Sequence, residues 1–475
     1  MKDIFKWFTQ ANDKISLVRI AWFVERFGYS EFTGVDRVLY LFLQYCADLD
    51  IPAAKHYLSA FLKTEGKKLI KRNNIKLETM ANYNYEEPAS LEEAYRVIST
   101  ATQALYDEYF KQEIGDHSFK VDMAAFMVQR KSERIQELLI SVFPRLSNGD
   151  DIDEVLEAVA TTINTIQTTY DIAHLEKLDF LSGDREVTKG VDIQKLLFKT
   201  TLPCIDGDLG GMFTKMVLSF TGSPGSGKTR AAMALFAYIG ITMAKIDVLF
   251  DELELSKMEV QNMFIAHHIV HLYGGKVKIP DSKMNRGELS PEEQRYYESA
   301  KMDLFESGKY GKLHIRTDGL VVEKLEKDMY MFLKHNRNVK LWVVDYAGLI
   351  QSKPVEKFGR RYDKYEIIDE AYKIAKRIAN IADIGVLFLN QFNKEGIDAA
   401  EKGKRIVSGM VEGGQSIARN ADYDMAMCMT PEQELANMRT LSTVKKRAAK
   451  GFQNVPIHTD LSVSIFRQLK QQATN

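Results

Sequence analysis

Residues 222–229 read Gly-Ser-Pro-Gly-Ser-Gly-Lys-Thr and directly follow the apolar run Met216-Val217-Leu218-Ser219-Phe220. The pattern Gly-x-x-x-x-Gly-Lys-Thr therefore stands where a predicted strand ends and a predicted helix begins. Glycines let successive backbone N–H groups turn inward around a polyphosphate, and the next helix presents its positive N-terminal end to the same anion. Eight matched positions in this context make an ordinary glycine-rich turn the weaker interpretation. The stretch predicts a binding site for a nucleoside triphosphate.

Each residue of this loop is predicted to contact ATP or another nucleoside triphosphate. Lys228 should reach the β- and γ-phosphates, and the Thr229 hydroxyl should bind Mg²⁺. The predicted cofactor-binding residues are Gly222, Ser223, Pro224, Gly225, Ser226, Gly227, Lys228 and Thr229.

Two further apolar runs end in carboxylates. Residues 341–345 end in Asp345, which should face the phosphates and hold Mg²⁺, because ligands of α/β sheets bind at the carboxyl ends of the strands. Residues 246–250 are followed by Asp251, Glu252 and Glu254, one of which is well placed to polarise an attacking water. The alternative for these three acids is a solvated helix N-terminus, where acidic residues are favoured anyway.

Two later segments offer groups that respond to the nucleotide or stabilise charge on its phosphates. Gln391 follows the run 386–390, and an amide at a strand end can report the presence of the γ-phosphate. A polar strand terminus is the alternative. Lys445 and Arg447 follow the run 441–444, and such cations stabilise charge on phosphate oxygens, also from a neighbouring subunit. A solvated basic patch is the alternative.

From Leu209 onward, strand-like and helix-like segments alternate, which predicts an α/β fold with a mostly parallel, helix-covered sheet. Residues 1–180 lack alternating strand patterns and predict an all-α domain that includes a helical hairpin at 133–170. Residues 181–208 turn polar and broken and predict a linker with a short amphipathic helix near 191–200, packed on a neighbouring subunit or on its own domain. Residues 209–475 form the predicted ATPase domain.

Composition limits the remaining possibilities. The 475 residues are too many for one core, and a net charge of −1 excludes a globally basic nucleic-acid coat but not a locally basic channel. Scattered Cys46, Cys204 and Cys428 exclude a cysteine-rich zinc module. The sequence has no apolar stretch of membrane-spanning length and no signal h-region, so we expect no membrane association.

Basic loops and a histidine cluster complete the candidate residues. Glycine-containing basic loops suit a nucleic-acid backbone, which needs charge rather than base readout, although most charge runs are only solvated. The candidates are Arg360, Arg361, Lys404 and Arg405. His267, His268 and His271 lack the intervening glutamate of a metalloprotease helix, so we interpret them as helix-surface histidines.

Taken together, these segments resemble the DnaB-type replicative helicases, phage forms included, whose ATPase core is RecA-like. The segments are 209–229, FDELELSKMEV at 250–260, NRGELSPEE at 285–293, WVVDYAGLI at 342–350, VLFLNQFNK at 386–394, EGGQSIARNAD at 412–422 and TVKKRAAKG at 443–451. Residues 1–130 are only vaguely similar. In place of the arginine that family members often carry before the glutamate of the glycine-rich loop, this chain has Val411.

The resemblance assigns roles by position. It places the catalytic glutamate on Glu254, the metal-binding aspartate on Asp345 and the glutamine sensor on Gln391. It places the trans-acting pair on Lys445 and Arg447. Glu412 and Gly414 fall in its glycine-rich DNA-contact loop.

The resemblance also implies a function. We expect a ring-forming helicase, a homo-hexamer that couples ATP hydrolysis at subunit interfaces to translocation on single-stranded DNA and to unwinding of forked DNA. Expected partners are a primase and a helicase loader, in the cytoplasm of a bacterial cell or a phage-infected host. One alternative is a RecA- or RadA-like recombination ATPase that forms filaments on DNA without unwinding it. A nucleotide-bound scaffold is a third, which has no need of Glu254, Asp345 and Gln391 together.

Overall fold

The computed structural model describes residues 34–49, 55–66, 91–110, 119–147, 151–172, 194–352, 363–447 and 450–469, with a few single positions elsewhere. The chain divides into two compact units, Met1–Val191 and Asp192–Asn475, which are described separately. The division lies inside the segment 181–208 that the sequence predicts as a linker.

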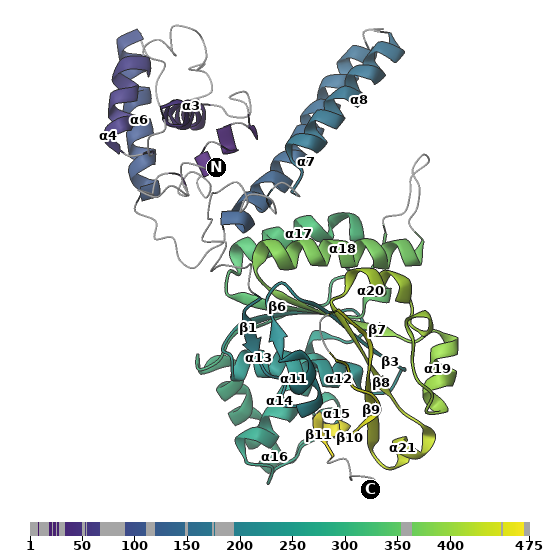
Figure 1. The fold of residues 1–475 in the computed structure, drawn as a ribbon. Coiled ribbons are helices and arrows are strands. Elements are labelled where there is room, and N and C mark those ends of the chain that lie inside the picture. Colours follow the sequence, from purple (N-terminus) through teal and green to yellow (C-terminus); the bar gives the residue numbers. More distant parts are fainter. Residues whose placement is uncertain are drawn as a thin grey trace. The chain divides into compact units, whose positions relative to one another are not determined.

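The described part of the first unit is helical. Two of its helices, α7 and α8, pack against each other as a hairpin (Figure 1). The Asp151 carboxylate accepts hydrogen bonds from the backbone N–H groups of Asp153 and Glu154 and so caps the start of α8. The helical segments are α3 (Gly34–Asp48), α4 (Lys55–Phe61), η2 (Leu62–Gly66), α6 (Leu91–Phe110), α7 (Phe119–Ser147) and α8 (Ile152–Thr169).

A nine-stranded sheet forms the centre of the second unit, in the order β11-β10-β9-β8-β3-β7-β6-β4-β5. The six strands from β8 to β5 are parallel, and β9, β10 and β11 add an antiparallel edge. The predicted α/β class with a mostly parallel sheet is confirmed. The strands are β3 (Val217–Gly222), β4 (Asp247–Glu252), β5 (Leu313–Arg316), β6 (Val339–Asp345), β7 (Gly385–Gln391), β8 (Tyr423–Cys428), β9 (Met438–Lys446), β10 (Val455–Asp460) and β11 (Ile465–Gln468).

Helices cover both faces of this sheet, with α17, α18 and α20 on one face and α12, α13 and α14 on the other (Figure 1). The helical segments are α11 (Pro203–Leu209), α12 (Lys228–Ala232), η5 (Met233–Ala237), α13 (Tyr238–Thr242), α14 (Lys257–Leu272), α15 (Asp281–Asn285), α16 (Pro291–Lys301), η6 (Met302–Glu306), α17 (Val322–His335), η7 (Ala347–Leu349), α18 (Lys364–Ala382), α19 (Lys394–Glu401), η8 (Ser408–Met410), α20 (Gly414–Asn420), α21 (Pro431–Leu435) and η9 (Leu461–Val463).

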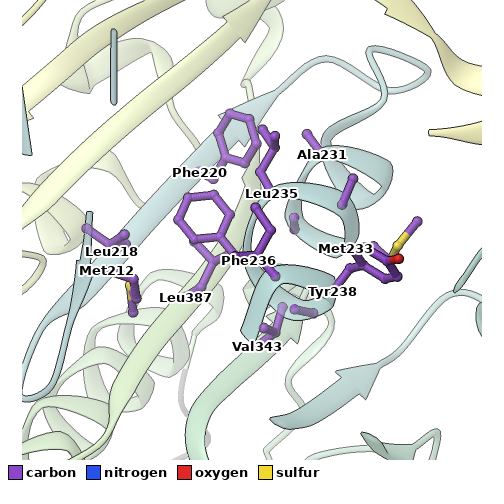
Figure 2. Close-up of a cluster of buried hydrophobic side chains, with 14 of the residues drawn as sticks. Met212, Leu218, Phe220, Ala231, Met233, Leu235, Phe236, Tyr238, Val343 and Leu387 are labelled. Carbon is purple, nitrogen blue, oxygen red and sulfur yellow. The ribbon is translucent and has the colours of Figure 1, made fainter. Parts of the chain in front are cut away.

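Successive side chains of β3 alternate between these two helical layers. Leu218 and Phe220 belong to the apolar cluster that includes Phe236 of η5 and Leu387 of β7 (Figure 2). Ser219 lies on the other face, where it shares hydrogen-bonding groups with α18. Because both of its faces are buried, the sequence of β3 is a nearly continuous apolar run. Residues 222–229 begin at the last residue of this strand.

The short helix predicted near 191–200 is wrong for the residues that the structure describes there. Leu196–Phe198 form a strand, β1, which pairs antiparallel with β2 (Met212–Phe213). The backbone N–H of Thr214 donates to the Lys195 carbonyl, and the Thr214 hydroxyl accepts from the Lys195 N–H. Short apolar runs fit either a helix or a strand, and pairing with β2 decides between them here.

Candidate active site

The loop between β3 and α12 has the backbone conformation that its sequence predicts. Gly225 and Gly227 have φ angles of 73° and 91°, in the left-handed region that favours glycine. A Cβ atom at Gly227 would lie 2.7 Å from Cδ2 of Leu461. A side chain at position 227 would therefore be strained by this φ and would have to displace the Leu461 side chain of η9, which packs against the loop. Residues 222–229 lie at the carboxyl edge of the parallel strands, where ligands of such sheets bind.

Lys228 is the charged side chain of this loop and is buried, with 6% of its surface exposed. Its ammonium lies 5.4 Å from the centroid of the Tyr346 ring, within the range of a cation–π contact. Tyr346 directly follows Asp345, so the loop and the end of β6 contact each other. Burial raises the pKa of Asp345, and the positive charge of Lys228 opposes that increase.

Asp345 and Glu252 end neighbouring strands and face each other in register. Both side chains are fully buried. Burial raises the pKa of each, and for Glu252 the nearby Asp345 charge raises it further. Within the described part of the chain, neither carboxylate oxygen of Asp345 meets hydrogen-bond geometry, although the Thr229 hydroxyl is near enough to favour its ionised form. Oε2 of Glu252 is likewise without a partner there.

These unpartnered oxygens fit a hard cation. Mg²⁺ prefers oxygen ligands and is usually held by one or two carboxylates together with substrate phosphates, rather than by an all-protein cage. Asp345 and the Thr229 hydroxyl supply such ligands beside the phosphate loop. Among the described residues, no group of three or more His, Cys, Asp or Glu side chains is placed to hold a metal ion.

The three acids at the end of β4 and just beyond it, Asp251, Glu252 and Glu254, have different surroundings. Asp251 accepts two hydrogen bonds of 2.6 Å from Arg316 and one of 2.7 Å from Nε1 of Trp342. Its carboxylate is therefore committed to a structural ion pair. One carboxylate oxygen of Glu252 accepts from the N–H groups of Glu254 and Leu255, at 2.9 and 3.1 Å. Of the three acids, Glu254 alone is neither fully buried nor held by an ion pair.

Glu254 and Gln391 are brought together at the same edge of the sheet. Nε2 of Gln391 lies 3.5 Å from Oε1 of Glu254, at the limit of a hydrogen bond. The neighbouring Asn390 is buried and donates to the hydroxyls of Ser219 and Tyr372, so its role is to join β7 to β3 and α18. Asn390 therefore has a structural role, whereas the adjacent Gln391 faces the site.

Lys445 and Arg447 lie far from their own phosphate loop. Strand β9 runs antiparallel to β8, and Lys446 pairs with Tyr423, which in turn pairs with Leu218 near the start of β3. Lys445 donates to the Ala421 carbonyl, and Arg447 contacts Asp422 at 3.4 Å. The phosphate loop leaves the opposite end of β3, about 17 Å away for a strand of this length. Both cations therefore lie at the amino edge of the parallel strands.

The candidate DNA-binding residues are only partly described. Lys404 and Arg405 lie in the exposed turn after α19, whereas Arg360 and Arg361 lie outside the described residues. The Glu412 carboxylate lies 2.5 Å from the Lys364 ammonium, and its backbone N–H donates to the Gln391 carbonyl. At Gly414 a Cβ atom would lie 1.6 Å from the Ser408 carbonyl oxygen, so that position requires glycine.

The interpretation of the three histidines as surface groups is wrong for two of them. His267 and His268 are buried in α14 with 5% and 3% exposed surface. His267 Nδ1 lies 3.2 Å from the Val463 carbonyl, and His268 lies between the Tyr238 hydroxyl and Asp303. Burial lowers the pKa of His267 to about 3, so this side chain is neutral. The high apolar content of α14 was the available signal, because it predicts a helix buried on most sides.

One charged residue beside the phosphate loop has no sequence motif. Arg439, at the start of β9, is buried and donates from Nε to the Ser226 carbonyl at 2.9 Å. A single arginine in a strand carries no spacing that would single it out, and only the antiparallel course of β9 brings it to the loop.

The comparisons with known proteins agree with this geometry. The sequence model of the DnaB-like helicase C-terminal domain matches residues 198–460, more than half of the chain. No curated protein sequence matches. None of the helices among the described residues is both long and apolar enough to span a membrane.

Two solved structures are similar to this chain. One is the structure of an ATPase domain that is 15% identical and covers 62% of this chain and 99% of its own, with a TM-score of 0.47. The other is a structure of a DnaB-like replicative helicase and its interactions with primase. It is 13% identical and covers 97% of this chain and 100% of its own, with a TM-score of 0.49.

Proposed function

We propose that this chain, which belongs to the DnaB-like helicase family, acts as a homo-hexameric ring with one nucleotide site at each subunit interface. Its activity is that of an ATP-dependent DNA helicase of replication. The family does not favour the alternative of a filament-forming recombination ATPase. Some residues of this chain act on the nucleotide of their own subunit, and others act on the nucleotide of the neighbouring subunit.

The observation that carries the ring proposal is the position of Arg447. It lies at the amino edge of the parallel strands, and the phosphate loop of the same subunit lies at the carboxyl edge. An arginine side chain is too short to cross a strand of about 17 Å. The nucleotide that Arg447 serves therefore belongs to a second copy, and Lys445 accompanies it. An interface with different surfaces on its two sides closes into a ring when its rotation permits.

Within one subunit, the loop 222–229 binds the phosphates of ATP. Lys228 places its charge on the β- and γ-phosphates, and Thr229 and Asp345 hold Mg²⁺, which when bound neutralises charge on the phosphates. Mg²⁺ would also favour the ionised form of Asp345, whose burial otherwise raises its pKa.

Glu254 is the group that orients and polarises the attacking water. It lies at the carboxyl edge of β4, is exposed and has Gln391 beside it. Gln391 senses the γ-phosphate, and its backbone carbonyl binds the N–H of Glu412 in the glycine-rich segment. A change at the nucleotide can therefore move the segment that begins at Glu412, and with it Gly414.

Single-stranded DNA is the polymer that this segment and the basic loops would contact. Lys404 and Arg405 are exposed and suit phosphate contacts, and we assign Arg360 and Arg361 to the same function. Glu412 already pairs with Lys364, so its role is to shape the loop rather than to bind phosphate. A primase and a helicase loader are the proposed protein partners.

The assembly is tested by native mass measurement of the full chain with ATP, Mg²⁺ and a single-stranded oligonucleotide, followed by unwinding of a forked duplex. We expect six copies on one strand and ATP-dependent strand separation. Open-ended filaments that hydrolyse ATP without separating the strands would contradict the ring.

A further inference from the structure

Arg439, the second residue of β9, and Arg447, which directly follows the strand, lie at opposite edges of the parallel strands. Arg447 follows β9 at the amino edge. Arg439 begins β9 at the carboxyl edge, where Ile457 of β10 pairs with it and Thr440 pairs with Cys428 at the end of β8. The Arg447 guanidinium is thus placed to reach the nucleotide of a neighbouring subunit. The Arg439 guanidinium lies beside the phosphate loop of its own subunit.

The Arg439 side chain is directed at the loop's backbone. Its Nε donates to the Ser226 carbonyl at 2.9 Å, and its Nη1 donates to the Met438 carbonyl at 2.8 Å. Ser226 is itself buried, and its N–H donates to the Ser223 carbonyl at 3.1 Å. The hydrogen bond from Arg439 therefore fixes a residue in the middle of the segment that surrounds the phosphates.

The charge of Arg439 is buried without an acidic partner. Only 3% of its surface is exposed, and among the described residues Arg439 forms no ion pair, with Glu434 the one acid that acts on its charge. Burial lowers the pKa of its guanidinium, opposed by the more distant charge of Glu434. Two neutral carbonyls satisfy N–H groups but do not neutralise a cation, and a buried charge without a counter-charge is costly.

We propose that Arg439 is a positioning residue of the nucleotide site that acts in cis: it holds the phosphate loop through the Ser226 carbonyl and has the bound polyphosphate as its counter-ion. This proposal rests on the assignment of loop 222–229 as the phosphate site. It divides the two arginines of β9 between the subunit's own nucleotide, served by Arg439, and the neighbour's, served by Arg447.

Two substitutions separate the hydrogen bond from the charge. Arg439→Gln keeps an N–H donor the same number of bonds from the backbone as Nε and removes the charge. Arg439→Lys keeps a charge and removes the planar donor group. The variants are compared in the full-length protein for binding of a fluorescent ADP, for its displacement by inorganic pyrophosphate, and for thermal unfolding with and without ADP.

For Arg439→Gln we expect ADP and pyrophosphate affinity to fall by about tenfold or more, the size of one interaction with a charged group. The melting temperature without nucleotide should equal or exceed that of the wild type, because an uncompensated charge is gone, and the increase on adding ADP should shrink. KM for ATP should rise much more than kcat falls. Arg439→Lys should recover part of the affinity.

Two results would overturn the role of Arg439. One is wild-type affinity for ADP and pyrophosphate in Arg439→Gln. The other is a lower melting temperature without nucleotide and an unchanged increase on adding ADP, which would identify a purely structural residue. Lys228→Ala is the reference for the site itself. If the wild type binds pyrophosphate no better than Lys228→Ala, the phosphate-loop assignment fails, and the Arg439 proposal fails with it.

Discussion

At the scale of single residues, burial and the contacting side chains determine the role of each acid at the carboxyl edge of the sheet. Asp251 is held by Arg316 and Trp342, and Asp345 is buried with unpartnered oxygens among the described residues. Glu254 is exposed and lies beside Gln391. The three carboxylates thus differ in role: Asp251 is a structural anchor, Asp345 is the proposed metal ligand and Glu254 is the proposed base. The chemistry of the three acids near the end of β4 does not separate Asp251 from Glu254, and only the family resemblance selects Glu254.

Replacing Glu254 by glutamine should preserve ATP binding and lower kcat by about 100-fold or more, because an amide cannot polarise water as a carboxylate does. Turnover and binding of a fluorescent ATP analogue measure the two effects. Asp251→Asn is the matched control, and it should instead lower the melting temperature, since Arg316 loses its buried partner. Full turnover in Glu254→Gln together with loss in Glu252→Gln would move the base to Glu252.

The sequence suggests candidate site residues where the spacing of residues carries information. Residues 222–229, Asp345 and Gln391 follow from their places in a motif or at a strand end. Arg439 does not, because a lone arginine in a strand has no pattern and its contact with Ser226 depends on the pairing of β9 with β8. The burial of His267 and His268 likewise depends on packing across α14.

At the scale of elements, the buried strands were the most predictable part. β3, β6 and β7 are apolar runs because helices cover both of their faces. The helix predicted near residue 196 is instead β1, since pairing with β2 outweighs local spacing. β10 was not predicted, although Val455, Ile457 and Thr459 are buried in alternation. That period of two was visible in the sequence and marks a strand with one buried face.

The exposed turn after α19 is a single element with a testable role. Reversing Lys404 and Arg405 to glutamate should weaken single-strand binding and flatten its dependence on salt by about 1.4 in the logarithmic slope, for two lost phosphate contacts. Binding of an oligonucleotide at several salt concentrations measures this slope. Basal ATP hydrolysis should persist while its stimulation by DNA fades.

The exposed lysines of α17, Lys324 and Lys327, provide the control for that experiment. Their reversal to glutamate changes the net charge by the same amount away from the turn and should leave the slope near that of the wild type. Equal slopes for both double variants would mean that the strand does not contact the turn.

At the scale of the whole molecule, the carboxyl and amino edges of the sheet in the second unit carry different functional groups. Its carboxyl edge carries the proposed nucleotide site at residues 222–229, with Arg439 beside them, and Arg447 lies at its amino edge. In the proposed ring, a neighbouring subunit completes the site at each of these edges. Because β9 runs antiparallel to β8, Arg439 and Arg447 lie at opposite edges of the sheet. The fold class alone does not predict this placement.

The direct test of this account is the ATPase activity of mixed rings. Arg447→Ala and Lys228→Ala should each be nearly inactive alone, with the arginine loss costing about 10³-fold or more. In an equal random mixture, about a quarter of the interfaces combine an intact loop with an intact arginine, so activity should partly return. Arg447→Ala mixed with the Arg447→Ala/Lys228→Ala double variant should stay inactive. Verified mixed rings of the two single variants without recovered hydrolysis would contradict catalysis shared between subunits.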